Sequence, residues 1–458
     1  MAGIGFRLHK LVQGDTYVQA AAAYLSSAVI TSGPWLSSLV SLALLGSARL
    51  AFLDRSDHGM LIATITYAFG ASLLVTGGMQ MIVTRYLADR LYVDDRDSIA
   101  PTCNAVLLLL LPLLLISVPF LVAGPFEWRY RLVAVTLFAT LSLSWMLSTF
   151  LSATRYFANI VVIFFLGHAL SLGGALLLGS VYGLTGGLAG YTLGQVVGTV
   201  LLATHVYHEF APSERIALDF VGYGKQYWDL LVFGMLYAAG IWVDNVLYWR
   251  APGNILIGGF FRANPAYDTL KLVAYLSTIL ASAMFLVHIE TRFFRHYKAF
   301  FGSVTGKGTL AHITAQKEGM IQAVRTGLAN VCTLQLILIG ALMLFAPEIV
   351  AFVGLPPERV ALFRVDVFAA NGQFLMLMAL LLLLYLDERR IAMWIVVVFV
   401  GGNLAVTQFA LVSGRLFDGA GYLIAASVSA AAALLLLRDR LTRLEYLTFM
   451  LQPLATAP

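Results

Sequence analysis

The most unusual chemistry in the sequence lies in the apolar run 228–249, where Asp244 and Asn245 stand side by side. Trp242 precedes them, and Tyr248 follows one helical turn after Asp244. Ionisable residues within membranes usually face a cavity or a partner. Sugars bind such groups, because their C–H faces stack on rings while their hydroxyls bond carboxylates and amides. We predict that these four residues line a transport path; the alternative is an aromatic belt at the outer interface.

A second candidate is the string Ser32-Gly33-Pro34-Trp35, which interrupts the apolar run 20–46. Pro34 cannot donate a hydrogen bond to the carbonyl of Ile30, so a helix should kink or unwind here. Backbone groups freed at membrane depth are tolerated where they are buried in protein or line a watery cavity. The four residues of the string are therefore predicted to belong to the transport path. The alternative is a packing kink.

Basic residues alternate with aromatic ones just after the apolar run 270–290, beginning with Arg292, Arg295 and Lys298. This pattern is typical of a helix that lies in the membrane interface or docks a partner. We predict partner docking by these three residues, with contact to membrane lipid as the alternative.

Two strings resemble enzyme motifs. Asp95-Arg96-Asp97 is an acidic pair in a short loop, and 205–209 carries two histidines and a glutamate. The first has no surrounding domain to hold a nucleotide, and the second lacks the H-E-x-x-H order of a zinc site. We predict no catalytic residue, no cofactor and no metal site.

Composition decides the protein class. The chain of 458 residues is 60% apolar and 12% charged, with a mean hydropathy of +0.85. Soluble domains are about 45–50% apolar, so this is a polytopic membrane protein. Its net charge of +5 would hint at nucleic-acid binding in a soluble protein. In a membrane protein it is expected from the basic residues of cytoplasmic loops, so we predict no nucleic-acid partner.

Apolar runs of roughly 18–25 residues cross a bilayer as single helices. We predict an all-α protein with twelve such spans, at 20–46, 61–84, 103–124, 132–153, 159–180, 184–206, 228–249, 270–290, 327–346, 363–386, 391–412 and 420–437. With both termini in the cytoplasm, roughly two thirds of the lysines and arginines fall on the cytoplasmic side, as the positive-inside rule requires.

The spans are predicted to form two lobes of six helices. The N-terminal lobe is 1–206, the polar stretch 207–227 is a cytoplasmic linker, and the C-terminal lobe is 228–458 with a long cytoplasmic loop at 291–326. Within the sixth span, glycines recur every four residues at Gly186, Gly190, Gly194 and Gly198. That spacing predicts close contact with a neighbouring helix.

Several strings, spread in order over nearly the whole chain, resemble the PelG family of Pel exopolysaccharide transporters. They include Ser32-Gly33-Pro34-Trp35, the stretch 84–92, Tyr267-Asp268-Thr269, His288-Ile289-Glu290-Thr291 and Tyr385-Leu386-Asp387. The resemblance implies a MOP flippase-like protein of the bacterial inner membrane that exports a hexosamine-rich polysaccharide for biofilm matrix. It also implies a synthase complex with a cytosolic glycosyltransferase, a cyclic-di-GMP receptor protein and a small membrane protein. No site residue is carried over from the family.

Two other functions are compatible with parts of the pattern. A proton- or sodium-coupled exporter of small molecules would show the same architecture. A membrane glycosyltransferase would need a soluble nucleotide-sugar domain, for which no loop is long enough, and it ranks last.

Overall fold

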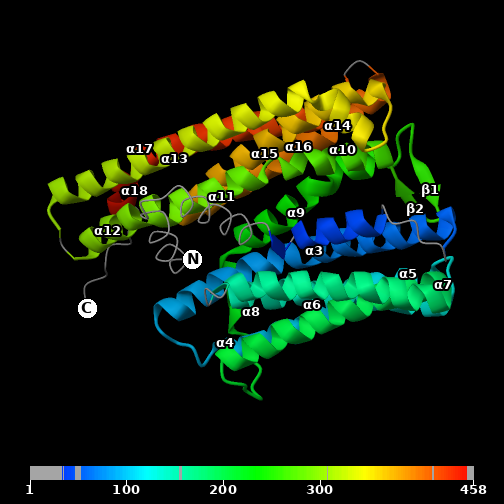
Figure 1. The fold of residues 1–458 in the computed structure, drawn as a ribbon. Coiled ribbons are helices and arrows are strands. Elements are labelled where there is room, and N and C mark those ends of the chain that lie inside the picture. The colour runs from blue at the N-terminus through cyan, green and yellow to red at the C-terminus, as the bar shows by residue number, and fades with distance from the viewer. Residues whose placement is uncertain are drawn as a thin grey trace, which may run out of the picture. The chain divides into compact units, whose positions relative to one another are not determined.

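The computed structural model describes residues 33–34, 36–46, 53–153, 157–306, 308–414 and 417–450. Contacts divide the chain into two units, which we call the N-terminal unit (Ser32–Asp268) and the C-terminal unit, which contains Thr269–Pro458. Helices dominate both units, which confirms the predicted all-α class (Figure 1). The exception among the described residues is a two-stranded antiparallel hairpin, β1 (Ile255–Ile257) and β2 (Phe261–Ala263), which the sequence analysis missed.

The N-terminal unit opens with the apolar helix Leu36–Gly46. It continues with α3 (Arg55–Tyr92), α4 (Ile99–Leu114), the 3-10 turn η1 (Leu115–Ser117), α5 (Val118–Ala123), α6 (Trp128–Ala153) and α7 (Phe157–Glu209). The short helix α8 (Asp219–Gln226) and α9 (Trp228–Tyr248) precede the hairpin. Helix α10 (Pro265–Leu276) begins in this unit and continues into the next.

The C-terminal unit continues with α11 (Ile279–His288), the π-helical turn η2 (Ile289–Phe293), α12 (Phe294–Thr305) and α13 (Leu310–Leu344). After α14 (Ala346–Phe352) and η3 (Pro357–Arg359) come α15 (Val360–Tyr385), α16 (Arg389–Ser413), α17 (Ala420–Thr442) and α18 (Leu444–Met450). Most of α15 is buried, so it forms the core of this unit. The predicted loop 291–326 is largely helical, being made of η2, α12 and the first half of α13.

Within the described ranges, ten helical stretches are long and apolar enough to cross a membrane. Helix α7 contains two of the predicted spans, 159–180 and 184–206, on either side of Gly183. Gly183 has φ 60° and ψ −143°, a conformation that is essentially restricted to glycine. The total of twelve spans and the cytoplasmic position of both termini stay predictions.

The glycine spacing in the second arm of α7 serves helix packing, as predicted. A Cβ on Gly190 would lie 2.0 Å from the carbonyl oxygen of Gly174 in the first arm, and one on Gly194 would lie 2.1 Å from the backbone nitrogen of Ser171. Only glycine permits backbones to approach this closely. The two arms of α7 therefore pack directly against each other.

Glycines also explain why α9 packs along α3 inside the N-terminal unit. A Cβ on Gly77 of α3 would lie 2.8 Å from the carbonyl oxygen of Gly234 in α9, and a Cβ on Gly234 would lie 2.2 Å from that of Gly77. The contacts thus divide the chain after α9, near Asp268, whereas the predicted C-terminal lobe begins at 228. The two-lobe organisation stays a prediction.

Candidate functional site

The end of α9 and the first turn of α10 hold Asp244 and Tyr267 together. Asp244 is 0% exposed and Tyr267 is 1% exposed. The Tyr267 hydroxyl donates a hydrogen bond to the Asp244 carboxylate. Tyr248 stacks on Tyr267 with 3.8 Å between ring centroids and 13° between ring planes. The buried carboxylate is thus bonded to a phenol that is itself fixed by ring stacking.

A second carboxylate, Asp268, lies beside this pair and accepts hydrogen bonds from three residues. The Asn245 amide donates to its Oδ1 over 2.7 Å. The Trp249 indole N–H lies 3.1 and 3.0 Å from its two oxygens. The Asn264 backbone N–H donates to Oδ2 over 3.2 Å. Carboxylate, amide and indole groups are thereby gathered within one helix end and the following turn.

Local sequence explains the position of this turn. Asn264 and Pro265 are favoured residues for the N-cap and first position of a helix. The Asn264 side-chain oxygen accepts the Tyr267 backbone N–H over 3.3 Å, while its amide donates to the Tyr248 carbonyl over 3.3 Å. One asparagine therefore caps α10 and ties it to the end of α9.

Of the four residues predicted in α9, the structure brings Asp244, Asn245 and Tyr248 into one cluster with Tyr267 and Asp268. Tyr267 and Asp268 were not predicted as site residues. The sequence did offer one signal, because both residues follow an Asn-Pro pair that favours the start of a helix. Their burial and their contact with the α9 cluster depend on tertiary packing, which the sequence does not show.

Trp242, the fourth predicted residue, precedes this cluster in α9. Its indole packs on Gly70 of α3, where an added Cβ would lie 3.2 Å from the indole ring. Its ring centroid is 6.2 Å from that of Trp249. Among the described residues, its buried indole N–H has no hydrogen-bond partner. Buried polar groups are nearly always satisfied, which makes this donor an exception among the described residues.

The Ser32–Trp35 string is described only in part, because Ser32 and Trp35 lie outside the described residues. Gly33 and Pro34 are helical. The Pro34 carbonyl accepts hydrogen bonds from the hydroxyls of Ser37 at 2.8 Å and Ser38 at 3.1 Å. A helix break that opens on a cavity stays a prediction.

The three basic residues predicted to dock a partner are exposed, and they are spaced three residues apart at Arg292, Arg295 and Lys298. The aromatic side chains of the same segment point the other way. Phe293 is 1% exposed, and its ring and that of Tyr297 pack on Tyr385 of α15 at 5.7 and 5.9 Å. The segment therefore presents a cationic face and buries an aromatic one.

The C-terminal unit contains a buried charged cluster that the sequence analysis missed. Lys271 is 2% exposed, and its ammonium lies 4.7 Å from the ring centroid of Tyr422 and 5.7 Å from that of Tyr275. Both phenols donate to Gln373 Oε1, at 2.6 and 2.7 Å. Asp366 is 0% exposed. Its carboxylate lies next to Gly419, which precedes Tyr422 by three residues at the start of α17. Lys271 and Asp366 stand near the starts of predicted spans, where charges are ordinarily end anchors.

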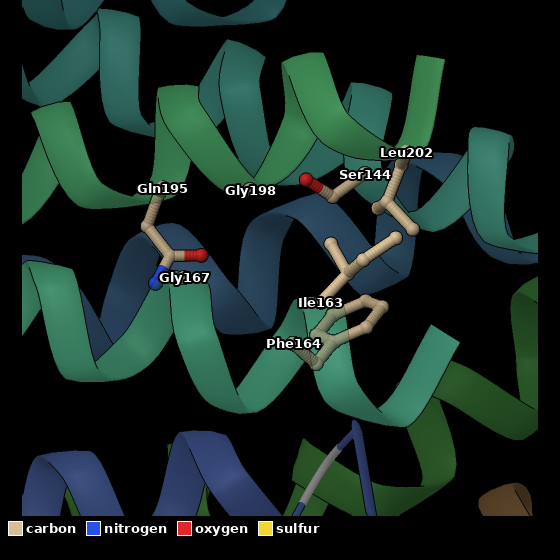
Figure 2. Close-up of a pocket in the computed structure, with 7 residues that line it drawn as sticks. All are labelled: Ser144, Ile163, Phe164, Gly167, Gln195, Gly198 and Leu202. Atoms are coloured by element: carbon tan, nitrogen blue, oxygen red, sulfur yellow. The ribbon is translucent and has the colours of Figure 1, made fainter. Parts of the chain in front are cut away.

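A small pocket lies between α6 and the two arms of α7, with Ser144 and Gln195 as its polar lining residues (Figure 2). The Ser144 hydroxyl is 2.6 Å from that of Thr199, and the Gln195 amide donates to Ser171 over 3.0 Å. The pocket volume is about 10 Å³, the space of one water molecule. It is too small for a sugar and is separate from the cluster around Asp244.

Solved structures share this fold at low sequence identity. A MOP superfamily transporter from Pyrococcus furiosus matches with a TM-score of 0.66 and 14% identity, covering 97% of this chain and 99% of that one. A multidrug resistance MATE family transporter in its outward-facing conformation matches with a TM-score of 0.65 and 14% identity, with the same coverage of both chains. A multidrug resistance MATE family transporter in its inward-facing conformation matches with a TM-score of 0.58 and 13% identity, covering 97% of this chain and 99% of that one. These likenesses show a MOP-type fold.

Among curated proteins, none matches this chain. The model of one protein family matches residues 1–449, and that family is PelG, described as a putative exopolysaccharide exporter (EPS-E). The apolar spans, the MOP-type fold and this match agree on a multi-pass membrane transporter rather than an enzyme, as expected for the bacterial inner membrane. The chain belongs to the PelG family of exopolysaccharide exporters.

Proposed function

We propose that this protein exports a hexosamine-rich exopolysaccharide from the cytoplasm to the periplasm, where the polymer contributes to biofilm matrix. The observation that carries the proposal is the family match over residues 1–449. The chemistry of the cluster at the end of α9 supports it, because carboxylate, amide and aromatic groups are the kinds of group that bind sugar hydroxyls and C–H faces. The transport path in this proposal includes the α9 cluster, Trp242 and the Ser32–Trp35 string.

A deletion strain tests the substrate. Without the protein, secreted polymer should disappear while polymer or its precursors accumulate inside the cell, and the wild-type gene should restore secretion. Normal secretion by the deletion strain would contradict the proposal. Normal secretion together with sensitivity to toxic small molecules would favour a proton- or sodium-coupled exporter of small molecules.

We further propose that the exporter works within a synthase complex and that the cationic face of Arg292, Arg295 and Lys298 docks one of its members. The candidates are a cytosolic glycosyltransferase, a cyclic-di-GMP receptor protein and a small membrane protein. The supporting observation is the two-sided segment, which commits its aromatic residues to packing on Tyr385 and leaves its charges exposed.

Charge reversal tests the docking face. Replacing all three residues by glutamate should abolish co-purification of the synthase without changing membrane abundance. A matched control reverses three other exposed basic residues, Arg215, Lys225 and Arg438, and should retain the complex. Retained co-purification in the first variant, with reduced membrane abundance, would instead assign the face to lipid.

A further inference from the structure

A buried histidine in the first arm of α7, His168, belongs to none of the clusters described above. Its side chain is 3% exposed. The imidazole stacks on Phe69 of α3, with 6.0 Å between ring centroids and 22° between ring planes. It also stacks on Phe164 of its own helix, at 6.3 Å and 19°. These two rings, both buried, fix the plane of the imidazole inside the N-terminal unit.

Hydrogen bonds assign the proton of the neutral ring to Nδ1. This nitrogen lies 2.8 Å from the Phe164 carbonyl oxygen, which can only accept, so Nδ1 carries the hydrogen. The Ser37 hydroxyl oxygen lies 3.2 Å from the same nitrogen, and its own hydrogen is donated to the Pro34 carbonyl over 2.8 Å. Ser37 therefore accepts a share of the Nδ1–H, and Nε2 is left as the acceptor of the ring.

The second ring nitrogen is the unusual feature of this histidine. Within the part of the chain that the structure describes, Nε2 is buried and has no hydrogen-bond partner. A histidine that only fills space in a core would be expected to satisfy both nitrogens, because buried polar atoms are nearly always bonded. Nε2 is the basic atom of the neutral ring, so it is also the atom that takes up a proton.

The surroundings of His168 favour the neutral ring. The described segments on its sides contain no lysine, arginine, aspartate or glutamate; they are Leu36–Gly46, 61–81, 132–153 and 157–204. Their other titratable side chains are Tyr67, Tyr182 and Tyr191. An imidazolium here would be a buried charge without a counter-ion, which is costly. A proton therefore binds to Nε2 only after the ring gains water or a new acceptor.

The helix Leu36–Gly46 is the neighbour that can release the ring. The two arms of α7 are locked together by close backbone contacts such as that of Gly190, and Phe164 lies on the same helix as His168. The helix Leu36–Gly46 instead follows Pro34, which has no backbone N–H, and contacts Nδ1 through the Ser37 hydroxyl. Space for a water molecule is close at hand, because Phe164 and the residue before His168 both line the small pocket (Figure 2).

We propose that His168 is a proton-binding site whose occupancy is coupled to the position of the helix Leu36–Gly46. With a neutral ring, the helix is held on α7 as in this structure. With Nε2 protonated, the helix leaves the ring and the imidazolium is hydrated. Since one state excludes the proton and the other binds it, acid shifts the population toward the released state.

This coupling would let a proton gradient drive a conformational step in transport. The helix that moves follows the Ser32–Trp35 string, which the proposed transport path includes. The inference goes beyond the proposed function, because it concerns the source of energy and holds for any exported substrate.

NMR of the purified full-length protein in lipid nanodiscs, with isotope-labelled histidine, reports the protonation of each ring nitrogen. His168→Gln identifies the His168 signals by their disappearance. Between about pH 8 and about pH 5, the range in which histidine ordinarily changes charge, these signals should pass from the Nδ1–H tautomer to the imidazolium.

Spin labels report whether the helix moves with the proton. They are placed on Val40 of the helix and Val162 of α7, which are 43% and 63% exposed, after both native cysteines are replaced by alanine. The label-to-label distance should change over the same pH range as the NMR signals. In His168→Gln, a neutral amide at this position should give one distance at every pH. His208→Gln is the matched control, since His208 is a half-buried histidine of the same helix, and it should keep the wild-type change.

Ser37→Ala removes the contact with Nδ1 and weakens the state that excludes the proton. The midpoint of the distance change should therefore move to higher pH by up to about one pH unit, the equivalent of one hydrogen bond.

Protonation of His168 at a constant label-to-label distance would overturn the proposal, since the histidine would then titrate without moving the helix. A ring that stays neutral over the whole pH range would overturn it as well. So would a distance change that persists in His168→Gln, because another group would then be responsible. These measurements contain no polymer, so the deletion strain still tests the proposed function separately.

Discussion

Replacing Tyr267 by phenylalanine removes the hydroxyl that bonds the Asp244 carboxylate and keeps the ring that stacks on Tyr248. Both partners are almost fully buried, at 1% and 0% exposure, so bulk water cannot substitute for the lost donor. Hydrogen bonds to charged groups contribute about 1.5–3 kcal/mol. We therefore expect the free energy of unfolding to fall by about 1.5–3 kcal/mol in Tyr267→Phe.

A double-mutant cycle isolates this bond from the rest of the site. Asp244→Leu removes the carboxylate that accepts from the Tyr267 hydroxyl, and the double variant removes both partners. The double loss should be smaller than the sum of the two single losses by about 1.5–3 kcal/mol. Unfolding by SDS in mixed micelles, followed by near-ultraviolet circular dichroism, measures all four proteins. Additive losses would refute the hydrogen bond as a stabilising contact.

The same position separates the possible roles of Asp244 in export. Asp244→Asn keeps an acceptor for the Tyr267 hydroxyl and removes the charge, while Asp244→Leu removes both. If Asp244 serves a neutral sugar through hydrogen bonds, the Asn variant should retain most secretion and the Leu variant should lose it. If Asp244 carries a coupled cation, both variants should fail. Normal secretion by the Leu variant at normal membrane abundance would remove Asp244 from the path.

Three further predictions concern side-chain packing and one ion pair. Lys271→Met should lower membrane abundance on immunoblots, because it removes a buried cation that contacts the rings of Tyr422 and Tyr275; unchanged abundance would contradict this. Gly190→Val should abolish folding, since its Cβ would lie 2.0 Å from a carbonyl oxygen; a monodisperse gel-filtration peak would contradict this. The hydrogen bond from Lys317 holds the pKa of Glu445 below its ordinary value of 4.5. Its stabilisation is therefore complete above pH 4.5 and is lost as pH falls through the lower folded-state pKa, so acid unfolding of Glu445→Gln should lack this component.

The sequence by itself determined that this is a helical, multi-pass membrane protein. Apolar runs predict helices because no other open-chain structure satisfies its backbone hydrogen bonds in hydrocarbon. The four-residue glycine spacing predicted the contact between the arms of α7, since that spacing clears one helical face. Asp244 was recognisable because a carboxylate in an apolar run is costly unless it has a partner or a wet cavity.

Only the tertiary structure decided which groups meet. Tyr267 lies 23 residues from Asp244, beyond a hairpin whose Gly258-Gly259 turn is a short-range signal that the sequence analysis overlooked. Lys271 and Asp366 stand near the starts of apolar runs, where a charge is ordinarily an interfacial anchor, and only packing shows that both are buried. Hydropathy reports how much apolar surface a segment carries, but the partner of a buried polar group depends on how separate helices pack.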